Sequence, residues 1–332
     1  MTLENLLMDA VATPGRTCPL HYHYGPDVFR QAPAAPLRDL EVLYVVGGLY
    51  GNELALQEIL RLFEAERGRK RLVFNGDFHW FDVDPARFAR IQQAVLTHTA
   101  LRGNVETELA DPDSHADAGC GCAYPEWVDD GVVERSNRIL NQLRGAVTPS
   151  QREALSDLPM WLTAKVGDCR IGIVHGDAQS LAGWSFAQEH LSDPARHDEV
   201  RDWFGRADVD AFASSHTCLP VFQRLIQSSP GSLRQHGWVL NNGAAGMPNF
   251  RGDPAGLLTR IALTPCEGPL SRAGVVHRGL HIDALAIEVD PAAVRQTFLA
   301  QWPAGTDAHA SYFDRIESGP DYQPHEVIRQ EI

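Results

Sequence analysis

Positive charge is scarce in this chain of 332 residues. The 29 Lys and Arg residues stand against 43 Asp and Glu residues, which gives a formal net charge of −14. A field of this sign repels phosphate backbones and anionic membranes, so we expect neither nucleic acid in bulk nor a membrane surface as a partner. An anionic substrate would need local help, for example from a metal ion.

Other absences narrow the class of protein. No apolar run approaches the roughly 20 residues of a membrane-spanning helix. Glu4 and Asp9 interrupt the first residues, where a signal peptide would have a basic start and an apolar stretch. Six cysteines in this length do not suggest a disulfide framework. We therefore expect reduced thiols and a cytoplasmic location, with a core that needs no crosslinks.

The first regular part of the sequence alternates between apolar runs and helical periods. EVLYVV, RLVFN and TALR are short apolar segments that predict buried strands. Helical spacing follows the first of them after Asn52, a good N-cap residue, and follows the second after Pro85, which suits a first helical turn. The order β-loop-α-β-loop-α-β is typical of an α/β sheet.

More strands are predicted downstream, and the last third, which is rich in them, is expected to form a second sheet. Because several strands are apolar on both faces, we predict an α/β fold in which two mixed sheets face each other between outer helices, a four-layer α-β-β-α sandwich. The predicted organisation has four parts: an irregular lead-in over 1–40, a main domain over 41–290, an inserted loop and helix at about 107–148 within it, and a C-terminal helix and tail over 291–332.

Polar residues that can bind a metal follow four of the predicted strands. Asp77 comes after RLVFN, and Asn104 comes after TALR. His175 and His216 follow the apolar runs RIGIV and DAFAS. Each fragment alone is more often an ordinary turn or a polar loop residue. Together they lie at the carboxyl ends of strands, where α/β sheets gather ligands, and their donors suit Mn, Fe or Zn.

The ordered set GD, GN, HG and SHT, each after a strand, resembles the metal-binding motifs of the calcineurin-like metallophosphoesterase superfamily. The segment VLNNGAAGMP, from Val239 to Pro248, is similar to the NPGSVGxP loop of many members. The resemblance extends from about Glu41 to Leu263, roughly two-thirds of the chain. It implies two facing sheets and a metal-dependent phosphoesterase.

Three positions depart from the superfamily pattern. There the first strand ends in D-x-H-G-N, whereas this chain has GGLYGN, with Gly48 in place of Asp and Tyr50 in place of His. The last motif, GHTH in the superfamily, ends here in Cys218. By the resemblance, these three positions are the private ligands of one of two metals. The ligands of the other metal are all retained: Asp77, Asn104, His175 and His216.

We therefore predict one tightly bound divalent metal per chain, with the other site emptied and partly filled by the Tyr50 phenol. The alternative is a rebuilt second site, in which Cys218, Tyr50 or His79 would serve as ligands. His79 enters this alternative because Asp77-Phe78-His79 repeats the D-x-H spacing. Val105 stands where many relatives have a His that aids catalysis, which removes one helper. Whether CGC at Cys120–Cys122 is a turn or a functional thiol pair is left open.

The function that the resemblance implies is hydrolysis of a phosphoester through a metal-bound hydroxide, at a mainly mononuclear or rebuilt site. The substrate would be a small phosphorylated molecule or a phosphoprotein. The alternative is a catalytically silent protein of the same fold that binds a phosphorylated ligand or a partner. Retention of four ligands favours the hydrolase, and loss of three favours the silent protein. Candidate catalytic residues are His79 and Tyr50, and candidate substrate-binding residues are Arg102, Asn242, Gly243 and Arg251.

Overall fold

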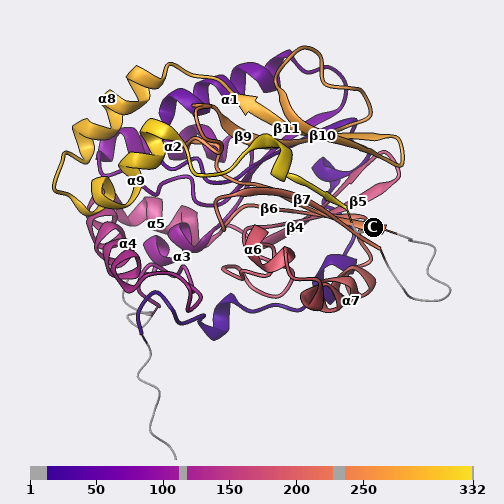
Figure 1. Ribbon diagram of the computed structural model, residues 1–332, viewed down its shortest axis with the longest axis horizontal. Helices are drawn as coiled ribbons and strands as arrows, with labels where there is room; N and C mark the ends of the chain where they lie inside the picture. Colours follow the sequence, from indigo (N-terminus) through magenta and orange to yellow (C-terminus); the bar gives the residue numbers. More distant parts are fainter. Residues whose placement is uncertain (1–12, 112–117, 227–235, 331–332) are drawn as a thin grey trace, which may run out of the picture.

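The computed structural model describes residues 13–111, 118–226 and 236–330 of the chain. Residues 1–12 of the predicted lead-in and residues 112–117 of the predicted insertion therefore lie outside the described residues. Two six-stranded sheets run through the centre of the described part (Figure 1).

The first sheet has the strand order β10-β11-β9-β1-β2-β3. Its strands β1, β2 and β3 pair in parallel, as the predicted βαβ units require, and β9, β11 and β10 add to β1 in antiparallel fashion. The bounds are β1 (Val42–Val46), β2 (Lys70–Asn75), β3 (Thr99–Leu101), β9 (Gly256–Ala262), β10 (Ser271–His277) and β11 (Leu280–Ile287).

The second sheet has the strand order β12-β7-β8-β6-β5-β4. Strands β5, β6 and β8 are parallel neighbours. Strand β4 runs antiparallel to β5, and β7 runs antiparallel to β8 but parallel to β12, so this sheet is also mixed. The bounds are β4 (Trp161–Val166), β5 (Cys169–Val174), β6 (Ala211–Ser214), β7 (Pro220–Ile226), β8 (His236–Asn242) and β12 (Ile328–Gln330).

The prediction that the last third of the chain forms the second sheet is wrong in its pairing. Strands β9, β10 and β11 belong to the first sheet, where β9 covers the edge that β1 would otherwise expose. Strands β7 and β8 instead complete the second sheet beside β6. An apolar run indicates that a strand is buried, but it does not specify which strand lies next to it.

Helices cover the outer faces of both sheets, which confirms the predicted four layers. In Figure 1, α1 and α2 lie over the first sheet, and α6 and α7 lie under the second, while α3, α4, α5, α8 and α9 gather at one end of the molecule. Among the described residues, none of these helices has the length and apolarity needed to cross a membrane. The bounds are α1 (Glu53–Ala65), α2 (Pro85–Leu96), α3 (Asn104–Ala110), α4 (Asp130–Leu143), α5 (Pro149–Ser156), α6 (Gln188–Leu191), α7 (His197–Ala207), α8 (Pro291–Gln301) and α9 (Asp307–Ser318).

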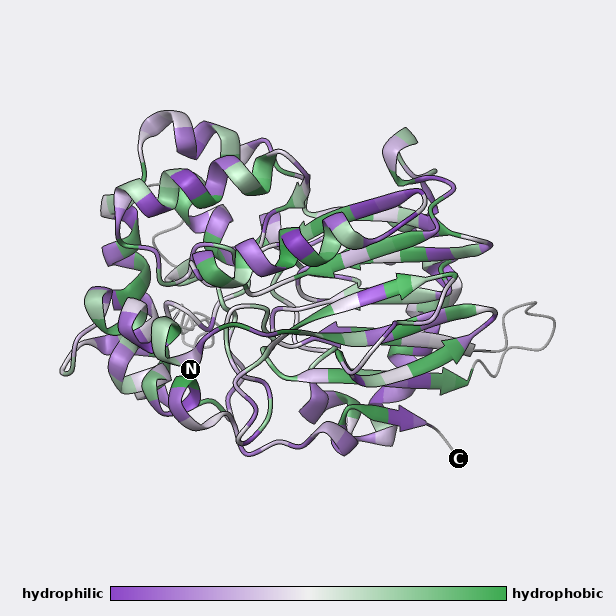
Figure 2. Cartoon of the chain, turned by 90° about the horizontal axis from the view of Figure 1, so that it is seen from above, coloured by the Kyte–Doolittle hydropathy of each residue, from purple (hydrophilic) through white to green (hydrophobic). Residues whose placement is uncertain are grey.

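Strand β1 shows why the apolar runs are uninterrupted. Successive side chains of a strand point to opposite faces, and both faces of β1 are covered. Tyr44 packs toward α1, beside Ile59 and Phe63, whereas Leu43 and Val45 pack toward the second sheet. Figure 2 shows the same pattern in colour, with mostly hydrophobic strands between helices of mixed character. This double burial holds the loop after β1 firmly at the end of the sheet.

Candidate metal centre

The loops after β2, β3, β5 and β6 bring four side chains into one cluster. Atom Nε2 of His175 lies 3.3 Å from Oδ1 of Asp77 and 3.1 Å from Oδ1 of Asn104. The same nitrogen lies 3.2 Å from Nδ1 of His216. All four side chains are buried, and one ligand atom each of Asp77, His175 and His216 falls within 4.8 Å of the others. The convergence that the sequence predicts is therefore present.

Backbone carbonyls fix the two imidazole rings. Nδ1 of His175 lies 2.8 Å from the carbonyl oxygen of Asn75, and Nε2 of His216 lies 3.1 Å from that of Cys122. Since a carbonyl only accepts, each of these nitrogens carries the proton and donates it. The other nitrogen of each ring then presents a lone pair to the cluster. Outer contacts of this kind are what orient histidine ligands around metals.

The two oxygen donors are fixed in a similar way. The amide nitrogen of Asn104 donates to the carbonyl of Cys120 over 3.0 Å, so its Oδ1 is the atom that faces the cluster. Oδ1 of Asp77 accepts a hydrogen bond of 3.2 Å from the backbone N–H of Val105. Asp77 itself has a positive φ of 53°, an uncommon conformation for a residue other than glycine. The backbone is thus strained where it presents the carboxylate.

The result is a set of four acceptors with no donor among them. Burial and the neighbouring His175 lower the pKa of His216 to about 3, so this ring is neutral at physiological pH. Burial alone would lower the pKa of His175, but the Asp77 carboxylate outweighs it and the net pKa is raised. One proton could relieve a single contact, between His175 and Asp77. Relief of all the contacts requires a cation at the centre, and the residues present therefore fit a divalent metal.

Glu106 organises the cluster from behind and was not singled out by sequence analysis. Its buried carboxylate accepts backbone N–H groups from Asp77 at 2.7 Å, from Phe78 at 3.0 Å and from Gly103 at 2.9 Å. Burial and the nearby Asp77 raise the pKa of this carboxyl to about 7. Glu106 therefore ties the loop after β2 to the start of α3, which sets the relative positions of Asp77 and Asn104. Its place at the third position of α3 is the only sequence signal for it.

The space next to this cluster is filled by a phenol and a thiol. Oη of Tyr50 lies 2.8 Å from Sγ of Cys218. A Cβ atom on Gly48 would lie 2.9 Å from Cζ and 3.0 Å from Oη of the same ring, so the ring covers the position where a side chain at 48 would begin. Arg315 of α9 donates to the carbonyl of Cys218 over 2.8 Å and holds that turn in place. This geometry supports an emptied site rather than a rebuilt one.

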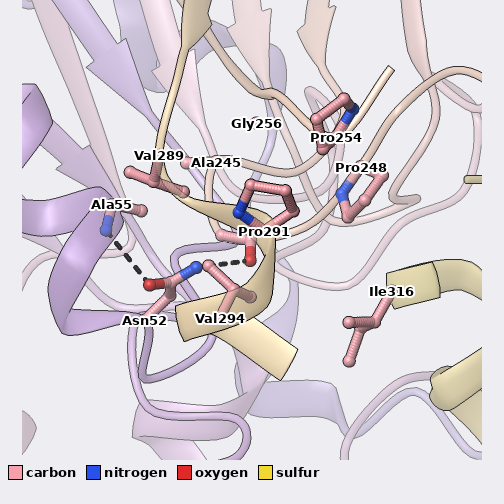
Figure 3. Close-up of a pocket in the computed structure, with 11 residues that line it drawn as sticks. Asn52, Ala55, Ala245, Pro248, Pro254, Gly256, Val289, Pro291, Val294 and Ile316 are labelled. Atoms are coloured by element: carbon pink, nitrogen blue, oxygen red, sulfur yellow. Dashed lines mark hydrogen bonds between the residues drawn. The ribbon is translucent and has the colours of Figure 1, made fainter. Parts of the chain in front are cut away.

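The segment Val239–Pro248, similar to a motif loop, supports the first loop of the fold. Figure 3 shows Asn52, whose side chain accepts from the N–H of Ala55 at the start of α1 and donates to the carbonyl of Gly246 over 2.9 Å. A Cβ on Gly246 would lie 1.9 Å from the carbonyl oxygen of Leu49, so only glycine allows this close approach. The cavity in Figure 3 measures only about 10 Å³, which is barely enough for one water.

Four candidate substrate-binding residues lie outside the pocket over the cluster. Asn242 is buried and donates to the carbonyls of Gly47 and Leu257, so it joins the two sheets. Gly243 forms the turn after β8 with a φ of 73°. Arg102 donates to the carbonyl of Ser156, and exposed Arg251 pairs with Asp321 at 3.3 Å. Their contacts are structural, and none of them points a free cation at the cluster.

His79 is placed away from the pocket as well. Its ring stacks on Phe88, with centroids 3.6 Å apart, and its Nδ1 lies 3.2 Å from Oδ2 of Asp82. Burial lowers the pKa of His79 well below its ordinary value and raises the pKa of Asp82 to about 8. The structure thus places His79 in a neutral buried pair, and it offers no support for the candidate roles as ligand or catalyst.

The raised pKa of Asp82 implies that the free energy of unfolding depends on pH. A carboxyl whose pKa is higher in the folded than in the unfolded protein stabilises the fold less as pH rises from about 4 to about 8. The Asp82→Asn variant keeps the shape of the side chain but cannot ionise. We therefore expect its free energy of unfolding not to fall in this way as pH rises. Between pH 5.5 and 8.5 the free energy of unfolding of the wild type should fall by roughly 2–3 kcal/mol relative to the variant. Urea unfolding at both pH values measures it, and a constant difference would contradict the assignment.

The cluster opens into a small pocket whose walls are mainly aromatic. Asp77, Asn104 and His216 line it, and its volume is about 40 Å³. Segments outside the strand-end motifs supply most of the walls, including the predicted insertion and α9. Sequence analysis missed these residues, because nothing in their local pattern marks them. The wall residues used below are Trp80, Tyr124, Trp184 and Tyr312.

Comparison with known proteins bears on the fold. The sequence matches no family model and no curated protein. Among solved structures, a hypothetical protein from Pyrococcus horikoshii OT3 aligns with a TM-score of 0.53 and 17% identity, over 85% of this chain and 99% of that one. A metallophosphoesterase from Sphaerobacter thermophilus aligns with a TM-score of 0.51 and 15% identity, over 84% of this chain and 100% of that one. At such identities the likeness shows a shared fold.

Proposed function

We propose that this chain, which has the metallophosphoesterase fold, hydrolyses phosphoesters of small molecules with the help of one divalent metal. One observation carries the proposal: four buried acceptors converge on a single point, and each is held there by its own backbone partner. Such a cluster is costly without a cation, since one proton between His175 and Asp77 relieves a single contact and leaves the others between acceptors. A protein that used the fold only as a scaffold would have no need to keep it.

The residues that would hold the metal are Asp77, Asn104, His175 and His216. One carboxylate, one amide oxygen and two neutral imidazoles suit Mn, Fe or Zn better than Mg or Ca. When bound, the metal neutralises charge on the phosphoryl group and makes water acidic enough to react at neutral pH. The chain supplies no Lys or Arg among the described residues that line the pocket, so charge neutralisation depends on that ion.

Tyr50 is the chain's own hydrogen-bond donor at this place. Burial, and the neighbouring Cys218, raise the pKa of its phenol well above the usual value, so the hydroxyl keeps its proton. The ring lines the pocket beside Asp77, and Cys218 holds the hydroxyl in position. A neutral O–H at this point can donate to a phosphoryl oxygen or to the leaving oxygen. This hydrogen bond would supply part of the charge stabilisation that the second metal provides in two-metal sites.

A second candidate function has its own observation. The pocket, of about 40 Å³, holds only about three waters, which leaves little room for the alcohol part of a phosphoester beside the metal ligands. In a catalytically silent protein of this fold, the metal site would bind a phosphorylated ligand or a partner without hydrolysing it. The two functions differ in one respect that is easy to measure: turnover by the metal-loaded chain.

The test uses protein stripped with a chelator and reloaded with Mn, Fe(II) or Zn. We expect hydrolysis of small phosphate monoesters that depends on the metal. His216→Ala should lower kcat/KM by at least about 100-fold, since it removes a ligand rather than an outer contact. His325→Ala, the same change at an exposed position, should leave kcat/KM unaltered. Full metal loading without turnover of any monoester would overturn the hydrolase and support the silent protein.

A further inference from the structure

A series of aromatic rings leads from the metal centre to the surface. The ring of Trp184 packs edge-on against His216, with centroids 5.4 Å apart, and its Nε1 donates to the carbonyl of Cys122 over 2.9 Å. Trp184 also contacts Tyr124 at 5.7 Å and Trp127 at 6.3 Å. Trp127 is 59% exposed, an unusual state for so large an apolar side chain. The rings of Trp184 and Tyr124, which line the pocket, therefore continue to the exposed ring of Trp127 outside it.

Further rings line the same pocket. Trp80 and Tyr312 line the pocket together with Tyr50. Behind them, Phe81 packs edge-on against Tyr312 at 4.9 Å and lies 5.9 Å from the Tyr50 ring. These residues come from the loop after β2, from α9 and from the loop after β1, so three distant segments contribute rings to one surface. A pocket lined by several aromatic rings favours a flat, uncharged group.

The scarcity of charged side chains at the pocket also favours an uncharged group on the substrate. Asp77 is the only Asp, Glu, Lys or Arg among the described residues that line it. The nearby Arg315 is engaged with the carbonyls of Pro248 and Cys218. The phosphoryl group would neutralise the positive charge that Asp77 leaves on the metal. A second anionic group on the substrate would then have no positive partner in the pocket. Nucleoside polyphosphates and phosphorylated acids are therefore disfavoured.

Given the proposed function, on which this step rests, we infer that the substrates are phosphate monoesters of small alcohols that carry an uncharged aromatic ring. Hydrolysis breaks the bond between phosphorus and the ester oxygen, and water supplies the new oxygen of inorganic phosphate. The alcohol leaves with one proton from that water. Trp184 is assigned as the main ring that contacts the aromatic group of the substrate.

The small size of the pocket, about 40 Å³, agrees with this choice. A volume for only about three waters has room for little more than the phosphoryl group, so the alcohol part of the substrate would lie against the rings that line the pocket. A flat ring can pack on those side chains, whereas a polar alcohol would leave their apolar faces without a partner. Exposed Trp127 is placed at the outer end, where such a substrate would first make contact.

The experiment compares 2-phenylethyl phosphate with butyl phosphate. Both have primary alcohol leaving groups, so a difference in kcat/KM reports binding of the ring and not the ease of bond cleavage. We expect the phenyl ester to be favoured by about ten-fold or more in the metal-loaded wild type. The phenyl ester with a carboxylate on its ring should lose most of this advantage. A butyl ester that is hydrolysed equally well would overturn the inference while the proposed function stands.

Two variants locate the preference. Trp184→Leu should reduce the ratio of the two kcat/KM values to near one, and this ratio is insensitive to partial metal loss. Trp161→Leu, a matched change outside the pocket, should keep the wild-type ratio. If Trp184→Leu does not fold, Trp127→Ser at the exposed end should lower the ratio about two-fold. An unchanged ratio in the Trp184→Leu or Trp127→Ser variant would overturn the assignment, and absence of turnover with both esters would count against the proposed function itself.

Discussion

Metal binding is expected to be lost when Asp77 is replaced by alanine. The change removes the only carboxylate of the cluster and leaves three neutral donors, which attract a divalent cation much less strongly than a set that includes a carboxylate. We expect the dissociation constant for Mn or Zn to rise by at least about 100-fold, more than removal of an outer contact would cause. Isothermal titration of metal into stripped protein measures this directly.

The matched control is Asp82→Asn, which alters a buried carboxyl on the same loop without touching the cluster. Its metal affinity should equal that of the wild type. Alanine at position 77 must adopt the positive φ of 53° seen for Asp77, so a modest loss of stability of about 1 kcal/mol should accompany the main effect. Equal metal affinity of Asp77→Ala and the wild type would show that the cluster is not a metal centre.

A gain of a second metal is expected when the first motif is restored. Gly48→Asp with Tyr50→His supplies the carboxylate and the imidazole that the superfamily pattern has at these positions. The two changes must be made together, because a Cβ at position 48 would lie 2.9 Å from the Tyr50 ring. Asp also tolerates the positive φ of 66° at this position better than most residues. Metal content should rise from one toward two per chain.

The single variants provide the control for this result. Gly48→Asp alone should destabilise the protein through its clash with the phenol, and the second change should relieve that loss. Addition of Cys218→His should tighten the second metal further, since it restores the last missing ligand of the pattern. Metal content that stays at one per chain in the triple variant would mean that the turn held by Arg315 has moved too far to rebuild the site.

The cluster itself could be predicted from the sequence for a simple physical reason. Asp77, Asn104, His175 and His216 each follow an apolar strand directly, and the ends of such strands meet at one edge of a sheet. The emptied site stays a prediction, and it came from the resemblance to the superfamily pattern, in which Gly48 and Tyr50 stand where Asp and His are expected. The burial of the strands could also be predicted from the sequence, since β1 is apolar on both faces.

Other features could not be predicted because they depend on contacts between distant segments. The backbone carbonyls of Asn75 and Cys122 orient the rings of His175 and His216. Every residue has such a carbonyl, so the sequence does not indicate which of them will do this. Asn242 resembles a ligand-binding residue of a loop, but in the folded chain its amide joins the two sheets. The same limit applies to the aromatic walls, to which α9 contributes Tyr312 from a segment that the sequence indicates only as a polar tail.

The most direct test of the account is the metal content of the chain purified without chelator. Elemental analysis against protein concentration gives the number of Mn, Fe or Zn ions per chain, and anomalous scattering from a crystal gives their positions. The account predicts one ion per chain, bound by Asp77, Asn104, His175 and His216, with the Tyr50 phenol beside it. No ion at that position, or two ions with Tyr50, Cys218 or His79 as ligands, would contradict it.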